Sequence, residues 1–322
     1  MGKVITKVSD GLGNQLFQFA MGSRAAAESG RVHVLDVTHF TVLRLFGSSF
    51  CRRSYLLDHF VEPARTCKWN PVLAGMFVFV WAVRGHLPVG LFRFVCKLFG
   101  VACAHPDNSF AWDPDYVSRA LRRAGNRSVY FSACYGFVPL LPDRNRLRKM
   151  FEVLDPCSKE ERRWLRDIEA CDSVSVHVRR TDYLSAGDGN NVLDRAYYEN
   201  AIGKILKSHP GAKFFFFSDD IDWCRQAYGD VAGASFVSLQ DSFDCPWREL
   251  RLMGACRHHV IANSTFSWWG AALSRFREGL TIYPKYWFWN VRTLEEMVYS
   301  DWVGVDAFCG LRSRGRRLAP EN

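Results

Sequence analysis

The 322-residue sequence predicts an α/β protein whose parallel sheets are covered by helices on both faces. The composition, 48% hydrophobic and 23% charged, is that of a folded globular chain, and the length is enough for two domains. In the second half, short apolar segments alternate with segments of helical periodicity. The four consecutive phenylalanines at 214–217 are typical of a strand that is buried on both faces of a parallel sheet.

The N-terminal residues predict a strand, a loop, a helix and a second strand. Val4–Val8 is an apolar strand, and the glycines within residues 10–15 are typical of a loop. Apolar residues at helical spacing predict a helix over Asn14–Glu28. Val32–Asp36 is the next expected strand, whereas residues 37–70 give little signal.

The region 71–103 is strongly apolar and resembles a membrane segment at first sight. Its uncharged run between Lys68 and Arg84, however, is shorter than the roughly 20 residues that a membrane-spanning helix needs. Arg93 and Lys97 interrupt the remainder. We therefore expect two helices of a subdomain. An amphipathic hairpin at a membrane surface is the first alternative and a true membrane span the second, so peripheral membrane contact stays open.

Regular alternation of strands and helices begins after a boundary expected near residues 150–158. The expected strands are Val129–Ala133 before the boundary and Val174–Val178, Lys213–Ser218, Ser235–Leu239, His259–Ala262 and a last one at Leu280–Tyr283 after it. The expected helices are one that begins after Pro156 and those at Tyr197–Ser208, Asp220–Tyr228, Pro246–Cys256 and Phe266–Ser274. This alternation is typical of a doubly wound parallel sheet.

Three parts of the chain follow from these patterns. We expect an N-terminal α/β domain over 1–155 with the apolar insertion at 71–103, a second α/β domain over 156–290, and a C-terminal segment over 291–322. The formal net charge of +9 comes partly from the basic tail Arg312–Arg317. Because no basic-aromatic motif accompanies this charge, we expect no nucleic-acid partner.

The 11 cysteines contain no Cys-x-x-Cys pair, so their spacing predicts neither a zinc site nor a disulfide framework. No signal peptide or membrane anchor is recognisable before the first strand. These features favour the cytoplasm or another reducing compartment. The Asp-x-Asp matches at Asp113–Asp115 and Asp220–Asp222 are common by chance, and we expect no metal site from them.

Polar side chains follow three expected strands of the second half, at residues 177–182, 218–220 and 263–265. Because the carboxyl ends of parallel strands meet at one edge of a sheet, where α/β proteins bind ligands, we expect these segments to lie close together. The forked guanidinium groups of Arg179 and Arg180 match the geometry of phosphate oxygens. A solvated surface pair of arginines is the alternative.

The other polar residues at this edge suit the same ligand. Ser264 and Thr265 could add hydroxyl and backbone donors to a diphosphate, since helix N-termini bind anions. Asp219 or Asp220 could accept hydrogen bonds from the N–H edge of guanine. The alternative for each of these four residues is a helix cap. One shared ligand site explains the coincidence better than several unrelated caps.

The N-terminal glycine loop differs from a dinucleotide-binding loop. The third glycine of that pattern would fall at residue 16, which is Leu16. Asn14 and Gln15 instead place amide groups at the start of the expected helix, where they could face a phosphate or a sugar.

Four segments together resemble the α-1,2-fucosyltransferases of glycosyltransferase family 11: Gly11–Gln18, His177–Tyr183, Phe217–Asp220 and Ile261–Ala272. The resemblance extends from residue 4 to about residue 285. It implies a GT-B-like fold, in which two Rossmann-like domains enclose a cleft. It also implies transfer of L-fucose, with inversion, from GDP-β-L-fucose to the 2-hydroxyl of a terminal galactoside on an oligosaccharide or glycoconjugate. No cofactor and no metal are implied.

The same resemblance suggests roles for individual residues. The second domain would bind the GDP-sugar, and the first would lie on the acceptor side. Arg179 would be the catalytic cation that stabilises charge on the departing β-phosphate, and Asp182 is the candidate base for the acceptor hydroxyl. The expected donor-binding residues are His177, Arg180, Asp219, Asp220, Asn263, Ser264 and Thr265, with Gly13, Asn14 and Gln15 from the first domain.

Three alternatives remain at this stage. The first is another nucleotide-sugar transferase of the same fold, including one that uses a different GDP-sugar. The second is a nucleotide-sugar or glycan-binding protein without turnover. The third, a phosphate-binding regulatory domain, would need the arginines but not the polar cluster at 263–265.

Overall fold

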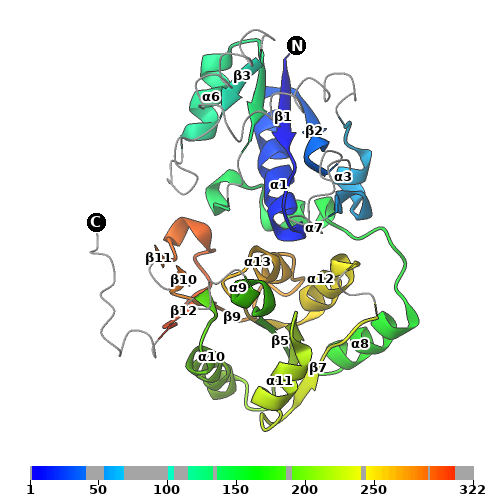
Figure 1. Ribbon diagram of the computed structural model, residues 1–322, viewed down its shortest axis with the longest axis vertical. Helices are drawn as coiled ribbons and strands as arrows, with labels where there is room; N and C mark the ends of the chain where they lie inside the picture. The colour runs from blue at the N-terminus through cyan, green and yellow to red at the C-terminus, as the bar shows by residue number, and fades with distance from the viewer. Residues whose placement is uncertain are drawn as a thin grey trace. The chain divides into compact units, whose positions relative to one another are not determined.

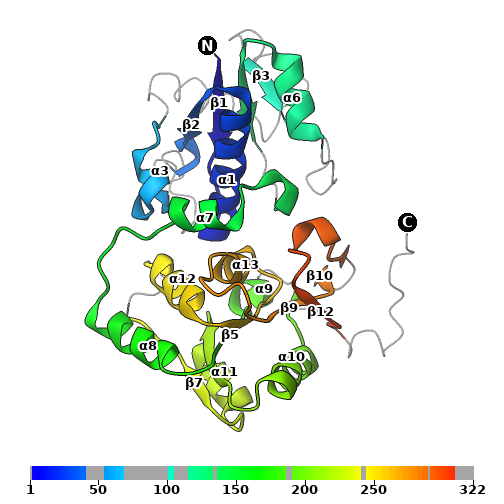
Figure 2. The ribbon, with the colours of Figure 1, turned by 180° about the vertical axis from the view of Figure 1, so that it is seen from behind.

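The computed structural model describes residues 2–40, 54–68, 101–104, 115–132, 136–185, 191–240, 244–288 and 291–308. The chain divides into two compact units, Met1–Leu154 and Asp155–Asn322. Each unit contains its own parallel sheet (Figures 1 and 2). Most of the apolar segment 71–103, with its two expected helices, and the basic tail lie outside the described residues. Within the described ranges, no helix is long and apolar enough to cross a membrane.

The first unit contains a four-stranded parallel sheet in the order β2-β1-β4-β3. Its elements are β1 (Lys3–Lys7), α1 (Leu12–Ser29), β2 (Val32–Asp36), η1 (Leu57–His59), α3 (Val61–Arg65), β3 (Val101–Ala104), α6 (Tyr116–Ala124), β4 (Ser128–Phe131), η2 (Val138–Leu140) and α7 (Arg144–Met150). The helix expected from Asn14 begins earlier, at Leu12, because Gly11 is its N-cap and has extended backbone. η1 and α3 lie in the region that gives little sequence signal.

Gly22 allows α1 to approach the sheet of the first unit closely. A Cβ atom on this residue would lie 2.1 Å from Thr6 Oγ1 and 2.4 Å from His33 Nε2. These two atoms share a hydrogen bond of 3.0 Å that links β1 to β2. Burial lowers the pKa of His33 to about 4, so its imidazole is neutral near pH 7. Only glycine therefore fits where the helix crosses this polar pair.

The second unit contains a six-stranded parallel sheet in the order β12-β9-β8-β5-β6-β7. Its elements are α8 (Lys159–Glu169), β5 (Ser173–Val178), α9 (Thr181–Ser185), α10 (Arg195–Ser208), β6 (Lys213–Ser218), α11 (Ile221–Tyr228), β7 (Ala234–Phe236), α12 (Pro246–Ala255), β8 (His258–Val260), α13 (Thr265–Ala272), β9 (Thr281–Pro284), β10 (Tyr286–Phe288), β11 (Val291–Arg292), η4 (Glu295–Met297) and β12 (Val303–Val305).

The expectation that the strand at 280–283 is the last one is wrong. That strand is β9, and β12 pairs with it in parallel at the edge of the sheet. β12 has only three residues and α9 only five, so hydrophobic periodicity does not reveal either element. Because β12 belongs to the second sheet, residues 291–308 are part of the second unit.

The strand order of the second sheet reverses between β5 and β8. From β5 the chain adds β6 and β7 on one side, and it then places β8 on the other side of β5. In open α/β sheets, ligands bind beyond the carboxyl ends of the strands at such a reversal. The residues that follow β5 and β8 are therefore the first candidates for a binding site.

The phenylalanine run of β6 is buried on both faces, as the sequence predicts. Phe214 and Phe216 pack in a cluster with residues of α10 and α11. Phe215 and Phe217 pack in a second cluster with residues of α8 and α12. Figure 2 shows α8 and α10 on opposite sides of β5. Helices therefore cover both faces of the sheet at β6.

Glu161 of α8 is a fully buried carboxylate that ties this helix to α12. Its Oε1 accepts a hydrogen bond of 2.7 Å from Arg251, and Arg248 Nε lies 3.6 Å from Oε2. Oε2 also accepts the backbone N–H of Ser158 at 2.8 Å, which completes a capping box at the start of α8. The charge of Glu161 is thus compensated wholly by neighbouring residues.

Glu161→Ala should lower the free energy of unfolding by about 3–5 kcal/mol, because it leaves Arg251 without its buried counter-ion. Glu160→Ala is the matched control. That side chain is exposed and accepts one hydrogen bond, from the Gln240 N–H at 3.1 Å. It should cost less than about 1 kcal/mol. Urea unfolding followed by circular dichroism and tryptophan fluorescence compares the two, and equal losses would contradict the assignment.

Candidate active site

The carboxyl edge of the second sheet brings together the three polar segments that the sequence predicts there. Residues 179–181 follow β5, 218–220 close β6, and 263–265 follow β8. Hydrogen bonds join the first two segments directly. The Tyr183 hydroxyl of α9 donates to the carbonyl oxygen of Asn263 at 2.8 Å, which joins the third. The segments after β5 and β8 flank the reversal in strand order.

Asp219 holds the loop that follows β5. Its Oδ1 accepts the backbone N–H of Arg180 at 2.9 Å. Its Oδ2 accepts the backbone N–H of Thr181 at 3.1 Å and the Thr181 hydroxyl at 2.6 Å. A carboxylate from the end of β6 therefore caps the first turn of α9, which follows the neighbouring strand.

Arg180 is held on both its face and its edge. Its guanidinium carbon lies 3.8 Å from the ring centroid of Trp223, and its Nε lies 3.3 Å from Asp220 Oδ2. Trp223 belongs to the first turn of α11 and was not among the site residues expected from the sequence. Its position three residues after Asp220 is the only sequence signal for this contact, and it becomes informative only when β5 is known to pair with β6.

Arg179 lies in a different environment from its neighbour. Its Nε is 3.6 Å from Asp219 Oδ2, which is an ion pair but longer than a hydrogen bond. Its side chain is 26% exposed, whereas that of Arg180 is 19% exposed. The adjacent arginines, equivalent in the sequence, therefore differ in how they are held.

Asp220 is the N-cap of α11 as well as the partner of Arg180. Its Oδ1 accepts the backbone N–H of Trp223 at 3.2 Å, while Oδ2 faces Arg180. Both aspartates thus form hydrogen bonds within the edge itself. Recognition of guanine by Asp219 or Asp220 would require release of some of these bonds, and that role stays a prediction.

The segment after β8 combines a buried amide with a helix start. Asn263 is 1% exposed, and its Nδ2 donates to the carbonyl oxygens of Asn191 at 2.9 Å and Trp287 at 2.8 Å. Ser264 is the N-cap of α13, since its Oγ accepts the Phe266 N–H at 3.3 Å. Thr265 is the first residue of that helix. The helix start can receive an anion, whereas the Asn263 amide nitrogen braces the surrounding backbone.

His177 and Asp182 flank the loop after β5. His177 belongs to β5, is 3% exposed, and has its ring centroid 5.6 Å from that of Phe266 in α13. This packing joins the strand to the helix that starts at the same edge. Asp182 is the second residue of α9. The proposed roles of these two residues in donor binding and proton transfer stay predictions.

The other expected donor-binding residues, Gly13, Asn14 and Gln15, lie in the first unit at the start of α1. The Gln15 side chain is fully buried. Its Nε2 donates to the carbonyl oxygens of Asp10 and Ser54, each at 2.9 Å. Its Oε1 accepts the Leu56 N–H at 3.0 Å. The Gln15 amide thus holds the glycine loop against the segment that follows residue 53.

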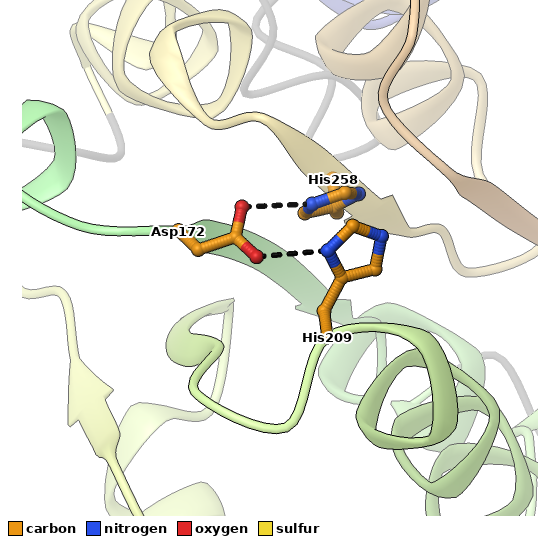
Figure 3. Close-up of side chains that lie close together, drawn as sticks. All are labelled: Asp172, His209 and His258. Carbon is orange, nitrogen blue, oxygen red and sulfur yellow. Dashed lines mark hydrogen bonds and ion pairs between the residues drawn. The ribbon is translucent and has the colours of Figure 1, made fainter.

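A second polar cluster lies at the opposite, amino edge of the sheet, where Asp172 contacts His209 and His258 (Figure 3). His209 Nδ1 is 2.9 Å from Asp172 Oδ2, and His258 Nε2 is 3.0 Å from Oδ1. Arg257 Nε lies 3.3 Å from the same Oδ1. Burial is the largest cause that lowers the pKa of His258, although Asp172 favours its charged form.

These three side chains have the geometry of a metal site, but one hydrogen bond argues against that role. The Leu280 N–H donates to His258 Nδ1 at 2.9 Å, so this nitrogen presents its lone pair. In the neutral ring the proton is therefore on Nε2, which donates it to Asp172. A metal ion bound at Nε2 would force the proton onto Nδ1, against the Leu280 N–H. The contacts thus favour a hydrogen-bonded cluster that joins β5, β8 and β9.

One glycosyltransferase family and several glycosyltransferase sequences are similar to this chain. The model of the family described as "Glycosyl transferase family 11" matches residues 147–306. The O-antigen biosynthesis glycosyltransferase WbnK of Escherichia coli is 33% identical, covering 92% of this chain and 99% of its own. The alpha-1,2-colitosyltransferase of Escherichia coli is 27% identical, covering 89% and 93%. Galactoside 2-alpha-L-fucosyltransferase Sec1 of Mus musculus is 32% identical, covering 52% and 48%.

Two solved structures show a similar fold. FUT1 of Arabidopsis thaliana, in complex with GDP, has a TM-score of 0.52 at 14% identity, covering 89% of this chain and 70% of its own. The alpha-1,6-fucosyltransferase NodZ, soaked with GDP-fucose, has a TM-score of 0.50 at 17% identity, covering 85% and 93%. These likenesses and the two parallel sheets confirm the α/β, GT-B-like fold that the sequence predicts.

The Asp172 cluster should not bind Zn²⁺, because the Leu280 N–H keeps the His258 proton on Nε2. Calorimetric titration of the whole chain with Zn²⁺ tests this, with Asp172→Asn as the matched variant, since a cysteine elsewhere, such as the exposed Cys67, can bind the ion. The two proteins should give the same isotherm and the same shift in melting temperature. A binding event present in the wild type and lost in Asp172→Asn would overturn the tautomer argument.

Proposed function

The chain belongs to glycosyl transferase family 11, and from this membership we propose that it transfers L-fucose from GDP-β-L-fucose to the 2-hydroxyl of a terminal galactoside. The reaction inverts the anomeric carbon and gives an α-1,2-fucosylated glycan. The observation that supports the proposal most is the position of Arg179 and the start of α13 on either side of the reversal between β5 and β8. A diphosphate at this edge would meet both a guanidinium and a helix N-terminus.

Two sequence relatives favour an α-1,2 linkage in the product of this chain. The mouse relative is a galactoside 2-alpha-L-fucosyltransferase, and one bacterial relative is an alpha-1,2-colitosyltransferase. The bacterial relatives match almost along their whole length, and one of them is an O-antigen biosynthesis glycosyltransferase. A bacterial surface oligosaccharide is therefore an equally compatible acceptor. We assign the acceptor to the first unit, and the donor to the carboxyl edge of the second sheet.

The proposed chemistry centres on the leaving group. As the bond between the anomeric carbon and the β-phosphate oxygen breaks, negative charge develops on GDP. A fixed cation beside that charge stabilises the transition state more than the ground state. Arg179 takes this role, and such a cation can replace a divalent metal, so we propose that neither metal nor cofactor is required. Ser264 and Thr265 add hydroxyl and backbone donors at the start of α13.

The acceptor hydroxyl forms the new bond to the anomeric carbon and loses its proton. Asp182, in the first turn of α9, is the candidate base. In an oxocarbenium-like transition state the sugar carries most of the positive charge, so strong activation of the nucleophile is not needed. Loss of Asp182 should therefore affect turnover less than loss of Arg179.

A second candidate function is transfer of colitose, which is L-fucose without its 3-hydroxyl. The specific observation in its favour is the colitosyltransferase relative, which is 27% identical over 89% of this chain. Both donors would use the same diphosphate and base contacts, and only a contact to the 3-hydroxyl separates them. Donor competition distinguishes the two sugars.

Purified whole chain with GDP-fucose and lactose should release GDP and form a trisaccharide that mass spectrometry identifies as fucosyl-lactose. GDP-colitose, GDP-mannose and UDP-galactose serve as competing donors. Prior treatment with EDTA should not change the rate, because Arg179 supplies the positive charge. Faster transfer of colitose would favour the second candidate. Loss of activity on chelation, restored by Mn²⁺ or Mg²⁺, would overturn the metal-independent chemistry.

Arg179→Ala should lower kcat by roughly 10²–10³, which corresponds to about 3–4 kcal/mol of lost transition-state stabilisation. Arg179→Lys should also be poor, because the planar fork is lost. Arg195→Ala is the control: Arg195 is an exposed residue of α10 that pairs with Glu199 at 2.6 Å, and its loss should leave kcat unchanged. A folded Arg179→Ala protein with near-wild-type kcat would show that another group stabilises the leaving group.

A further inference from the structure

The first turn of α11 presents a binding surface for the Arg180 guanidinium. Asp220 supplies a carboxylate 3.3 Å from Arg180 Nε, and Trp223 supplies an aromatic face 3.8 Å from the guanidinium carbon. The backbone N–H of Trp223 donates to Asp220 Oδ1 at 3.2 Å, which holds the carboxylate at the start of the helix that carries the indole. A planar guanidinium fits such a combination of edge and face better than an ammonium does.

This surface restrains Arg180 at its side chain, while Asp219 restrains it at its main chain. The Arg180 N–H donates to Asp219 Oδ1 at 2.9 Å, and the Arg180 carbonyl oxygen accepts the Leu184 N–H at 3.0 Å within α9. Both main-chain polar groups and the guanidinium are thus engaged. Arg180 is joined to Arg179 by a single peptide bond, so its position limits the backbone from which Arg179 extends.

We propose that Trp223 is a positioning residue of the transfer reaction. Its indole face and the Asp220 carboxylate hold Arg180, and this fixes the loop from which Arg179 meets the donor diphosphate. Arg180 then acts through the loop and not by direct contact with phosphate. The link to turnover rests on the proposed function, whereas the hold of Trp223 on the loop does not depend on it.

The stack also has a second support. The Trp223 ring lies 5.8 Å from the ring of Tyr228, at an interplanar angle of 81°. Tyr228 itself is buried and stacks on Phe216 of β6 at 5.1 Å. The indole is therefore anchored to the core of the second unit, against which Trp223 also packs.

The test uses substitutions that separate the aromatic face from simple bulk. Trp223→Leu keeps an apolar side chain without a π face and should lower kcat/KM for GDP-fucose about 5- to 30-fold, the range expected for a partly desolvated cation–π contact. Trp223→Phe keeps a face and should stay within about threefold of the wild type. Arg180→Met leaves the indole in place but removes the contacts with both Trp223 and Asp220, so its loss should be at least as large as that of Trp223→Leu.

A double-mutant cycle shows whether Trp223 acts through Arg180. In the Arg180→Met background, Trp223→Leu should cause little further loss, because the coupled partner is already absent. Losses that multiply in the double variant would overturn the proposal. So would a Trp223→Phe protein as impaired as Trp223→Leu while both keep the wild-type melting temperature.

Hydrogen exchange separates this proposal from the proposed function. Trp223→Leu and Arg180→Met should each speed exchange in peptides covering 179–185, whereas peptides covering α8 should stay unchanged. If exchange in 179–185 is unaffected in both variants, the positioning role is wrong, whatever the activity. If that segment loosens but the wild type transfers no sugar from GDP-fucose, the hold of Trp223 on the loop stands and the proposed function fails.

Discussion

The carboxylate of Asp219 is the constraint on which the candidate active site depends. It extends from the end of one strand and binds two backbone N–H groups and a hydroxyl from the segment after the neighbouring strand. The loop after β5 therefore takes its shape from a different part of the sequence. The loop can form only when β5 and β6 are paired in register, with His177 opposite Phe217 and Val178 opposite Ser218. Formation of the sheet and formation of the site are thus one event.

Two arginines and two aspartates at this edge balance each other's charge in pairs. Arg180 with Asp220 is the closer pair, at 3.3 Å, and it also has an aromatic surface beneath it. Arg179 with Asp219 is the looser pair, at 3.6 Å, and Asp219 already accepts three hydrogen bonds. The adjacent arginines therefore differ in the distance to their carboxylate partners although the residue type is the same. The proposed division between catalysis by Arg179 and positioning by Arg180 would follow from this difference.

Sequence reasoning predicts β5 to β9 of the second unit and the polar groups that follow β5, β6 and β8, because burial on both faces leaves continuous apolar runs such as 214–217. It does not predict the short strands β10 to β12. It does not predict the strand order, which decides that the segments after β5 and β8 flank a reversal. Trp223 could not be predicted as a site residue for the same reason. Its partner Arg180 follows β5, whereas Trp223 lies in the helix that follows β6. From the sequence, the Gln15 amide is expected to face a phosphate or a sugar. In the structure it forms hydrogen bonds with backbone groups of Asp10, Ser54 and Leu56.

The edge strand β12 has a consequence for the choice of truncation points. It covers β9, and the residues just after it, Ala307 and Phe308, are 0% and 1% exposed within the core of the second unit. A shortened chain intended to remove the basic tail would therefore have to end after Phe308. A cut before Val303 would uncover the hydrogen-bonding edge of β9, and an open parallel edge is a template for pairing between molecules. Such a chain would be lost to aggregation although every residue of the candidate active site was still present.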